Sequence, residues 1–321
     1  MAGFLLRRAV QALIVIVGVI LVVFLLSQLI PGGECKAVLG PKATMHNCVR
    51  FNRLNGFNQP VLRQFVEYLK GLIWPFWHPN LGYSYKFNEG VTSVIAQRLP
   101  KTLVLVGTST IISLMVAIPL GILQVVRRNH PVDYSVTGMA FVFYAMPTFL
   151  LGTLLIIWFS FDLGWFPSQP PSAQSAWAVF TDPQAFVLPI ITLSAVTVAS
   201  FSRYMRSSMM DSMAGDYIRT ARAKGSSQRR VLYGHALRNA LIPILTLIGL
   251  SLPAIVSGAV ITETVFNYPG MGQLTVYAAG NSDIPLVLGT TLVATVATVV
   301  GSLLADVLYA MADPRIRFGA L

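Results

Sequence analysis

The chain of 321 residues is poor in charge and in cysteine. Only 11% of its residues are charged, 23 of them basic and 12 acidic, and there are two cysteines. A soluble domain has about 25% charged residues, so this chain has too little polar surface to cover a globule in water. Two cysteines exclude a disulfide-dense scaffold. Because 55% of the residues are hydrophobic, the chain is not disordered, and we expect it to be solvated by lipid.

The sequence also lacks the motifs of common catalytic and nucleotide-binding sites. It contains no His-Glu-x-x-His helix, no Gly-x-Ser-x-Gly turn and no Gly-x-x-x-x-Gly-Lys-Ser/Thr loop. We therefore predict that the chain is not an enzyme and holds no metal or cofactor. If the protein uses ATP, another chain binds it. The basic excess is better explained by membrane orientation than by nucleic acid, because DNA binding does not need long uncharged runs.

Long apolar runs predict an all-α integral membrane protein. A helix rises about 1.5 Å per residue, so about 20 apolar residues cross about 30 Å of hydrocarbon. Met146-Pro147 and Pro189 lie inside two of the runs and either kink the helices or line a substrate path. Six transmembrane helices are predicted, the fourth being the shortest: 9–30, 102–126, 134–161, 186–201, 240–261 and 284–309.

Basic residues indicate the orientation, because cationic flanks stay in the cytoplasm during insertion. The short loops after the third and fifth predicted helices have no Lys or Arg. We expect both termini in the cytoplasm. The predicted inner pieces carry Arg7, Arg8, Arg127, Arg128, Arg203, Arg206, Arg219, Arg222, Lys224, Arg229, Arg230, Arg238, Arg315 and Arg317.

A long outer segment follows the first predicted helix. We divide the chain into residues 1–98, with this helix and the external segment, and residues 99–321, a five-helix core. Cys35 and Cys48 both lie in the external segment. In an oxidising compartment they could form a disulfide that contributes about 3 kcal/mol, and two free thiols are the alternative. Trp74-Pro-Phe-Trp-His78 predicts an interfacial or re-entrant stretch.

Ionisable residues are almost absent from the predicted helices. Glu263 and Asp306 lie near helix ends, where we expect water to reach them. A carrier driven by an ion gradient usually has a carboxylate in the membrane. The sequence therefore disfavours such a carrier, which remains the alternative from another functional class.

Residues 210–239, between the fourth and fifth predicted helices, predict a helix–turn–helix. Asp216 suits an N-cap, residues 217–224 form about two turns, and Gly225 suits a left-handed C′ position. Ser226 or Ser227 then begins a second helix.

The surface of this segment predicts a docked element. Ala214, Ala221 and Gly225 recur at helical spacing and form a small-residue stripe that allows close backbone approach. Cations at positions 219, 222 and 224 flank the stripe. The segment either docks into a groove of a partner or rests on anionic lipid headgroups.

These residues resemble the coupling motif of permease subunits in ATP-binding-cassette (ABC) importers. The motif reads Glu-Ala-Ala, three residues, Gly, nine residues, Ile-x-Leu-Pro. Gly225 and Leu237 fit it, and Ala221 matches the last alanine. Three positions depart from it, and the departures resemble the dipeptide/oligopeptide branch: Arg219 replaces the glutamate, His235 the isoleucine and Arg238 the proline.

Three further stretches are similar to this family: Arg98-Leu-Pro-Lys-Thr-Leu103, Glu263-Thr-Val-Phe-Asn-Tyr-Pro-Gly-Met-Gly272 and Asp313-Pro-Arg-Ile-Arg317. A first membrane helix followed by a long outer segment resembles the first of the two permease subunits. The external segment with its two cysteines is the part that the resemblance covers least.

The resemblance implies the type I importer fold in a bacterial inner membrane. The implied partners are a second permease, cytoplasmic ATPases that bind ATP and Mg²⁺, an extracytoplasmic peptide-binding protein and membrane lipid. The substrate would be di- or oligopeptides, with nickel chelates, haem or glutathione as alternatives. The implied ATPase-coupling residues are Gly215, Asp216, Tyr217, Arg219, Thr220, Ala221, Arg222, Ala223, Lys224, Gly225, His235, Leu237 and Arg238.

The stretch after the fifth predicted helix suggests a second site. Residues 268–272 predict a tight turn and residues 273–279 a short interfacial helix. One interpretation is a structural turn that returns the chain to the sixth predicted helix. The other is an outer gate or a contact for the binding protein. Glu263 could orient the amino group of a peptide. The candidate residues are Glu263, Tyr268, Pro269, Gly270 and Gly272.

Overall fold

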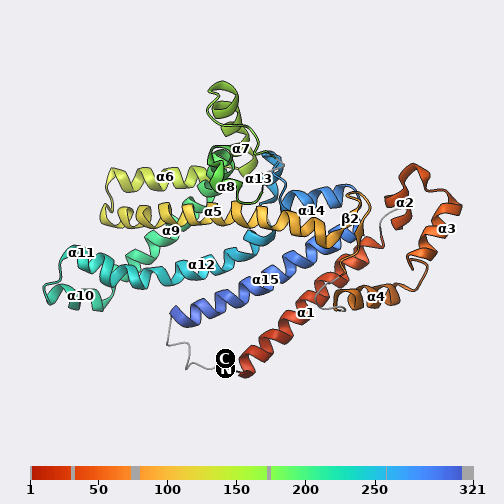
Figure 1. Ribbon diagram of the computed structural model, residues 1–321. Coiled ribbons are helices and arrows are strands. Elements are labelled where there is room, and N and C mark those ends of the chain that lie inside the picture. Colours follow the sequence, from red (N-terminus) through yellow and green to blue (C-terminus); the bar gives the residue numbers. More distant parts are fainter. Residues whose placement is uncertain (1, 30–32, 74–79, 172–174, 258, 313–321) are drawn as a thin grey trace.

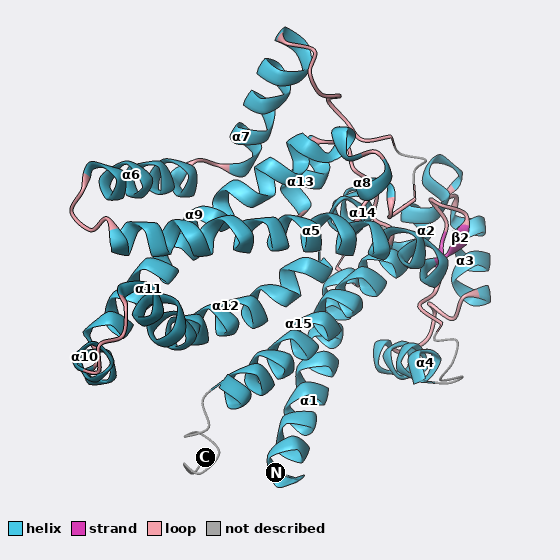
Figure 2. Cartoon of the chain, turned by 60° about the vertical axis from the view of Figure 1, so that its left-hand side comes forward, coloured by secondary structure: helices cyan, strands magenta, loops and turns pink. Residues whose placement is uncertain are grey.

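The computed structural model describes the chain except residues 1, 30–32, 74–79, 172–174, 258 and 313–321. The described part consists of helices and one short hairpin (Figure 2). Two predicted features, the interfacial stretch 74–78 and the family-like stretch 313–317, lie outside the described residues.

Five long helices run along the molecule (Figure 1). Each contains a stretch long and apolar enough to cross a membrane. Helix α9 runs well past the predicted end of the fourth span at Phe201, and α5 contains the predicted boundary between residues 98 and 99. The helices are α1 (Ala2–Ser27), α5 (Val91–Val126), α9 (Val187–Ala214), α12 (Leu237–Ser257) and α15 (Ile284–Ala312).

Helices α5 and α9 approach each other closely where small residues meet. A Cβ at Gly121 would lie 2.6 Å from Cβ of Met205, so only glycine fits there. Further along, the Ser194 hydroxyl donates to the Ser109 carbonyl at 3.1 Å. Small residues and hydroxyls of this kind hold membrane helices together where lipid provides no hydrophobic driving force.

The third predicted span is broken. Helix α6 (Pro131–Ala145) and the unit formed by α7 (Thr148–Leu155) and the π-helical η2 (Ile156–Asp162) meet at 102°. Pro147 has no N–H to continue the helix. Helix α7 turns sharply away from the direction of α6 (Figure 2), and its Leu151 and Leu155 pack with Leu188 of α9. The predicted interruption at Met146-Pro147 is therefore confirmed, and it is a sharp break between two helices. The number of candidate spans is five, or six if this bent pair is one span.

The segment after α1 folds into short elements at one end of the molecule (Figure 1). A disulfide joins Cys35 and Cys48, whose Cα atoms are 5.4 Å apart, so the predicted pairing is confirmed. The strands form an antiparallel hairpin. The elements are α2 (Gly33–Leu39), η1 (Gly40–Lys42), α3 (Met45–Leu54), α4 (Val61–Ile73), β1 (Tyr83–Ser84) and β2 (Glu89–Gly90).

The remaining short elements lie at both ends of the molecule and, for α8 and α13, between the ends beside α7 (Figure 1). Helices α10 and α11 lie at one end, whereas α14 lies near β2 and α2 at the other (Figure 1). These elements are α8 (Ala178–Thr181), η3 (Pro183–Phe186), α10 (Asp216–Ala223), α11 (Gln228–Arg230), the π-helical η4 (Val231–Ala236), α13 (Val260–Val265) and α14 (Met271–Gly280).

Candidate coupling site and outer motif

Helix α10 and its cap both begin one residue earlier than predicted. Gly215 is the N-cap, with an extended backbone, and Asp216 is the first helical residue. Asp216 is therefore not the cap, although its carboxylate still lies in the first turn, where the helix dipole favours negative charge. The Tyr217 ring covers Gly215, because a Cβ at Gly215 would lie 2.5 Å from that ring.

The C-terminal end of α10 has the hydrogen bonds of a Schellman motif. The Ser226 N–H donates to the Ala221 carbonyl at 3.1 Å, and the Gly225 N–H donates to the Arg222 carbonyl at 2.9 Å. Gly225 has a φ of +77°, which confirms the predicted left-handed position. Ser227 then caps the next helix with an extended backbone, as one of the two predicted starts.

One face of α10 is anchored to the helices on either side of it. Ile218 is fully buried in a cluster with Met205 and Met209 of α9 and Val231 of η4. Ala221 belongs to the same cluster. The predicted small-residue stripe is therefore wrong at Ala221, which packs inside the chain because the neighbouring turn η4 covers that face.

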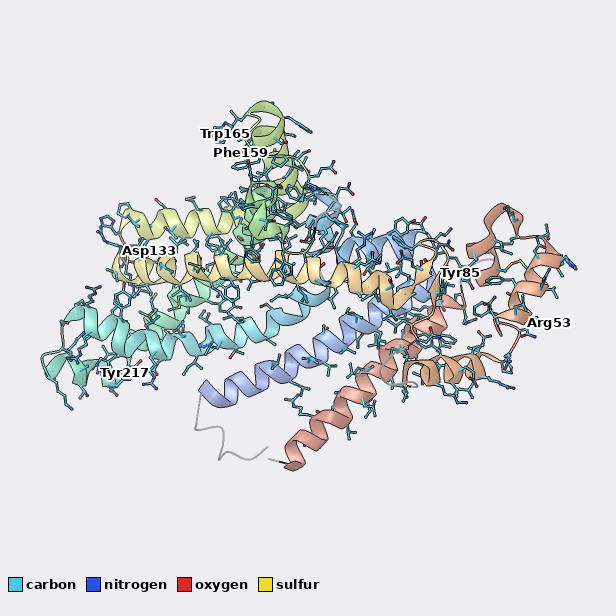
Figure 3. All side chains as sticks on the ribbon, viewed as in Figure 1. Arg53, Tyr85, Asp133, Phe159, Trp165 and Tyr217 are labelled. Carbon is cyan, nitrogen blue, oxygen red and sulfur yellow. A yellow bond between two sulfur atoms is a disulfide. The ribbon has the colours of Figure 1, made fainter. Side chains whose placement is uncertain are left out.

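The opposite face of α10 is exposed and mostly cationic. The Tyr217 side chain is exposed at the end of the molecule (Figure 3). Arg219 lies 3.4 Å from Asp216, and both are highly exposed, so this pair contributes little stability. The other exposed candidates are Thr220, Arg222, Ala223, Lys224, Gly225, His235 and Arg238, whereas Gly215 and Leu237 are half-buried.

The turn between α5 and α6 is fixed to α9 by an ion pair that the sequence did not reveal. Arg206 donates from Nε and from a terminal nitrogen to the two carboxylate oxygens of Asp133, both at 2.9 Å. The Asn129 N–H also donates to Asp133, at 3.2 Å. The Asp133 side chain is almost fully buried. Such a bidentate pair fixes both distance and orientation. Its only sequence signal was an acidic residue at the start of an apolar run.

At the other end, two of the family-like stretches meet in one hydrogen-bonded cluster, which we call the outer cluster. The Thr102 hydroxyl donates to Glu263 Oε1 at 2.8 Å, and the Gln273 N–H donates to Glu263 Oε2 at 3.0 Å. The Met271 N–H donates to the Thr102 hydroxyl at 2.7 Å. These bonds join α5, α13 and α14. The prediction that water reaches Glu263 is wrong, because its side chain is fully buried.

The glycines of this stretch leave room for the carboxylate. A Cβ at Gly270 would lie within 2.5 Å of both Glu263 oxygens, and a Cβ at Gly272 would lie 2.7 Å from the Val260 backbone. The Tyr268 hydroxyl donates to the Lys101 carbonyl at 3.0 Å. All five predicted outer residues, Pro269 included, are buried. They form internal contacts in this chain and present no exposed surface.

Burial also determines the ionisation of the outer cluster. Glu263 lies outside the candidate membrane spans, and desolvation raises its pKa above the usual value for a carboxyl group, against hydrogen bonds from Gln273 and Thr102 that lower it. Desolvation and the nearby Glu263 charge raise the pKa of the Tyr268 hydroxyl. The predicted helix after the turn is confirmed as α14.

The fold and the two sites define a helical, multi-pass membrane protein, and comparisons with known proteins identify its family. Residues 117–318 match the model of the binding-protein-dependent transport system inner membrane component, and residues 1–106 match the model of its N-terminal part. The chain is 37% identical over 320 residues to the oligopeptide transport system permease protein AppB of Bacillus subtilis, covering 99% of this chain and 100% of the relative. It is 34% identical to y4tP of Sinorhizobium fredii, named a probable peptide ABC transporter permease protein, with 99% and 100% covered.

The chain therefore belongs to the family of binding-protein-dependent transport system inner membrane components. This confirms the predicted all-α permease fold and the inner-membrane location. The family is a component of a transport system and not an enzyme family. A self-contained carrier is not favoured, because the family depends on a binding protein.

Proposed function

We propose that the chain is one of two permease subunits of an ATP-driven importer that takes up di- or oligopeptides from an extracytoplasmic binding protein. The names of the two relatives support peptides as the substrate. Within the described residues, no contact favours nickel chelates, haem or glutathione. ATP and Mg²⁺ bind to the ATPases and not to this chain.

The observation that supports the proposal most strongly is the two-faced helix α10. Its buried face packs against α9 and η4, and its exposed face carries Arg222 and Lys224. An ATPase groove with carboxylates would bind the exposed face. Because protein interiors are close-packed, a displacement of α10 would be transmitted through Ile218 to α9 and, through η4, to α12. The ATPases would thereby bias the permease between two conformations.

This assignment also implies an orientation. The end with α10, the α5–α6 turn and the described start of α1 would face the cytoplasm, as the basic residues of the loops suggest. The opposite end, with α2–α4 and α14 (Figure 1), would face the binding protein. A disulfide at that end fits an oxidising compartment.

The test is a charge reversal on α10 with a matched control. The complex is reconstituted with the second permease, the ATPases and the binding protein. We expect Arg222→Glu to weaken co-purification with the ATPases and to lower ATP-dependent peptide uptake at least about tenfold, a loss of about 1.4 kcal/mol of binding. Arg53→Glu makes the same change at an exposed position at the opposite end (Figure 3) and should leave co-purification with the ATPases unchanged. If Arg222→Glu keeps full ATPase association and uptake, the coupling role of α10 is wrong.

A further inference from the structure

Helix α9 carries a cation inside a candidate membrane span. The span covers residues 183–214, so Arg203, which the sequence placed in a cytoplasmic piece, lies within it. The Arg203 guanidinium lies over two rings of α6, 4.8 Å from the centre of Phe141 and 5.2 Å from that of Tyr144. In the described part of the chain no carboxylate pairs with it. An ionisable group inside a span is costly and usually marks a path for ions or substrate.

The guanidinium points away from the end of the molecule that carries α10. Arg206, one turn later in α9, pairs with Asp133 near the start of α6. Phe141 and Tyr144 follow Asp133 by about two and three turns of α6, which is about 12–16 Å along the helix axis. An arginine that faced lipid would extend toward the nearest headgroups. We therefore expect the Arg203 guanidinium to face water or a polar group.

A pocket of about 340 Å³ lies beside this cation. Pockets of about 300–1,000 Å³ are typical of small-ligand sites. Four of the lining residues recur at intervals of three or four positions on α9, so they share one face of that helix. The lining residues, all of which carry a polar group, are Tyr144 of α6 and Ser200, Arg203, Tyr204 and Ser207 of α9.

The polar groups of this pocket are accessible and available. Both tyrosines are more than half exposed, and Arg203 and Ser207 are exposed as well. Within the described residues, none of the four hydroxyls of the lining has a hydrogen-bond partner. By contrast, the Thr197 hydroxyl of the same helix donates to the Leu193 carbonyl at 3.0 Å. The pocket therefore presents one cation and several free hydroxyl donors to a ligand.

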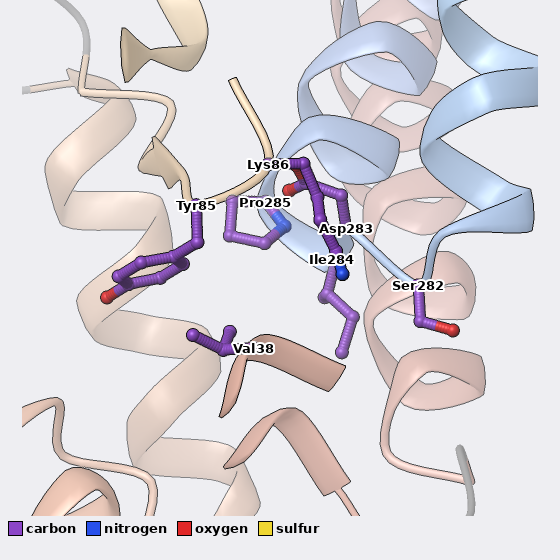
Figure 4. Close-up of a pocket in the computed structure, with 7 residues that line it drawn as sticks. All are labelled: Val38, Tyr85, Lys86, Ser282, Asp283, Ile284 and Pro285. Carbon is purple, nitrogen blue, oxygen red and sulfur yellow. The ribbon is translucent and has the colours of Figure 1, made fainter. Parts of the chain in front are cut away.

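The hollow at the start of α15 offers no comparable site. Its lining includes Tyr85, Lys86 and Asp283 (Figure 4), and its volume is about 10 Å³, which is room for about one water molecule. The Asp283 carboxylate already accepts the Ser84 hydroxyl. A charged group lining a hollow is thus not enough, and the α9 pocket differs from this one in both its room and its unpaired donors.

The donors of the α9 pocket fit a carboxylate. A guanidinium can bind a carboxylate through two parallel hydrogen bonds, and hydroxyls can donate to the same oxygens. A lipid phosphate has similar chemistry, but it stays at the level of the headgroups, whereas the guanidinium lies about 12 Å or more along α6 from Asp133. The rings of Tyr144 and Tyr204 offer apolar surface for a side chain next to the carboxylate.

We propose that this pocket binds the C-terminal carboxylate of the transported peptide. Arg203 would pair with the carboxylate, Ser200 and Ser207 would donate to its oxygens, and the last side chain of the peptide would lie against the two tyrosines. The break between α6 and α7 comes directly after this part of α6, and interrupted helices frame the substrate sites of many transporters. The inference rests on the proposed function, because it takes a peptide as the cargo.

The test compares a peptide with its C-terminal amide. The complex of this chain with the second permease and the ATPases is placed in lipid nanodiscs, without ATP or binding protein. Binding of Ala-Ala-Phe and of Ala-Ala-Phe amide is measured by equilibrium dialysis. We expect the acid to bind at least about tenfold more tightly than the amide, a difference of about 1.4 kcal/mol.

Variants assign this difference to the pocket. Arg203→Gln should abolish the preference for the acid, and Arg203→Lys should keep part of it. Ser207→Ala removes only an exposed hydroxyl and should weaken binding of the acid about threefold without changing binding of the amide. Arg53→Gln removes an exposed cation at the opposite end (Figure 3) and should keep the full preference. The melting temperature of each variant is measured alongside, so Ser207→Ala still tests the pocket if Arg203→Gln does not assemble.

Several outcomes overturn the proposal. Equal binding of acid and amide by the wild type, or a preference that persists in Arg203→Gln, means that the carboxylate is not held by Arg203. A preference seen in the isolated chain but lost in the complex means that the second permease fills the pocket. A phospholipid that native mass spectrometry finds on the wild type and not on Arg203→Gln identifies a lipid phosphate as the ligand. None of these measurements uses ATP, so their failure leaves the proposed ATP-driven uptake unaffected.

Discussion

The Thr102 hydroxyl donates to the Glu263 carboxylate at 2.8 Å, although 161 positions separate the two residues. This bond unites two stretches that resemble the same permease family but are far apart in the chain. The Met271 N–H, bound to the same hydroxyl at 2.7 Å, adds the start of α14. The outer cluster therefore makes the beginning of α5 and the α13–α14 turn one structural unit.

Removing the carboxylate should weaken this unit more than neutralising it. Glu263→Ala leaves the Thr102 hydroxyl and the Gln273 N–H unpaired and should cost about 2–4 kcal/mol, since each unpaired buried group costs about 1–3 kcal/mol. Glu263→Gln keeps an acceptor and should cost less than about 1.5 kcal/mol. The measurement is the thermal unfolding of the detergent-solubilised protein. Thr102→Ser keeps the hydroxyl and serves as the control. An equal loss of stability in Glu263→Ala, Glu263→Gln and Thr102→Ser would contradict the role of these hydrogen bonds.

The raised pKa of Glu263 predicts a pH dependence of stability. Burial raises this pKa in the folded protein, so the folded protein retains a proton that the unfolded chain has already released. The contribution of Glu263 to stability is therefore greatest below the pKa of the unfolded chain and falls as the pH rises through the folded pKa. Unfolding temperatures between about pH 4 and about pH 8 should show this decline in the wild type. The decline of the unfolding temperature with pH should be smaller in Glu263→Gln than in the wild type. An equal decline in both proteins would mean that groups other than Glu263 cause it.

The ion pair at the other end predicts strong coupling between two helices. Asp133 is buried and makes two bonds to Arg206, each of 2.9 Å. Arg206→Met leaves an unpaired buried charge and should cost about 3–5 kcal/mol. The double variant Asp133→Leu/Arg206→Met removes both charges and should recover most of this loss, as a double-mutant cycle of unfolding free energies would show. Additive losses would mean that the pair does not join α6 to α9.

The end of α10 predicts a difference between two substitutions of one glycine. A Cβ at Gly225 would meet no atom within 4 Å, but the residue has a φ of +77°. Gly225→Val should therefore cost about 1–2 kcal/mol through the backbone alone, whereas Gly225→Asn, which tolerates this conformation, should cost less. Hydrogen exchange of the Ser226 amide, which donates to Ala221, reports the integrity of the turn. Identical exchange in both variants would show that the left-handed conformation is not needed.

The features that could be predicted from the sequence are those that depend on neighbouring residues. Apolar runs predicted the membrane helices, because length and hydrophobicity are local properties. Gly225 predicted the end of α10, because its φ of +77° is easy only for glycine. The two cysteines of the chain, Cys35 and Cys48, are separated by 13 positions, so only one disulfide within the chain could be predicted. The family resemblance of residues 216–239 rested on local spacing as well.

The break at Pro147 could be recognised in the sequence only in part. Proline predicted a defect in the hydrogen bonding of the helix, but the 102° angle between α6 and α7 depends on what packs around them. The same limit applied to Ala221. Its helical position was visible in the sequence, but which face η4 covers was not.

The sequence by itself determined the membrane-spanning class of this protein, the short coupling helix and the family to which it belongs, because each follows from composition or from spacing within a few turns. Only the tertiary structure decided that Glu263 is buried against Thr102, that Asp133 binds Arg206 across 73 positions and that Ala221 faces inward. The physical reason is that a carboxylate, a hydroxyl or a methyl group has the same local sequence signal whether it meets water or a partner. Its role depends on which distant side chains the packed helices bring within hydrogen-bond distance.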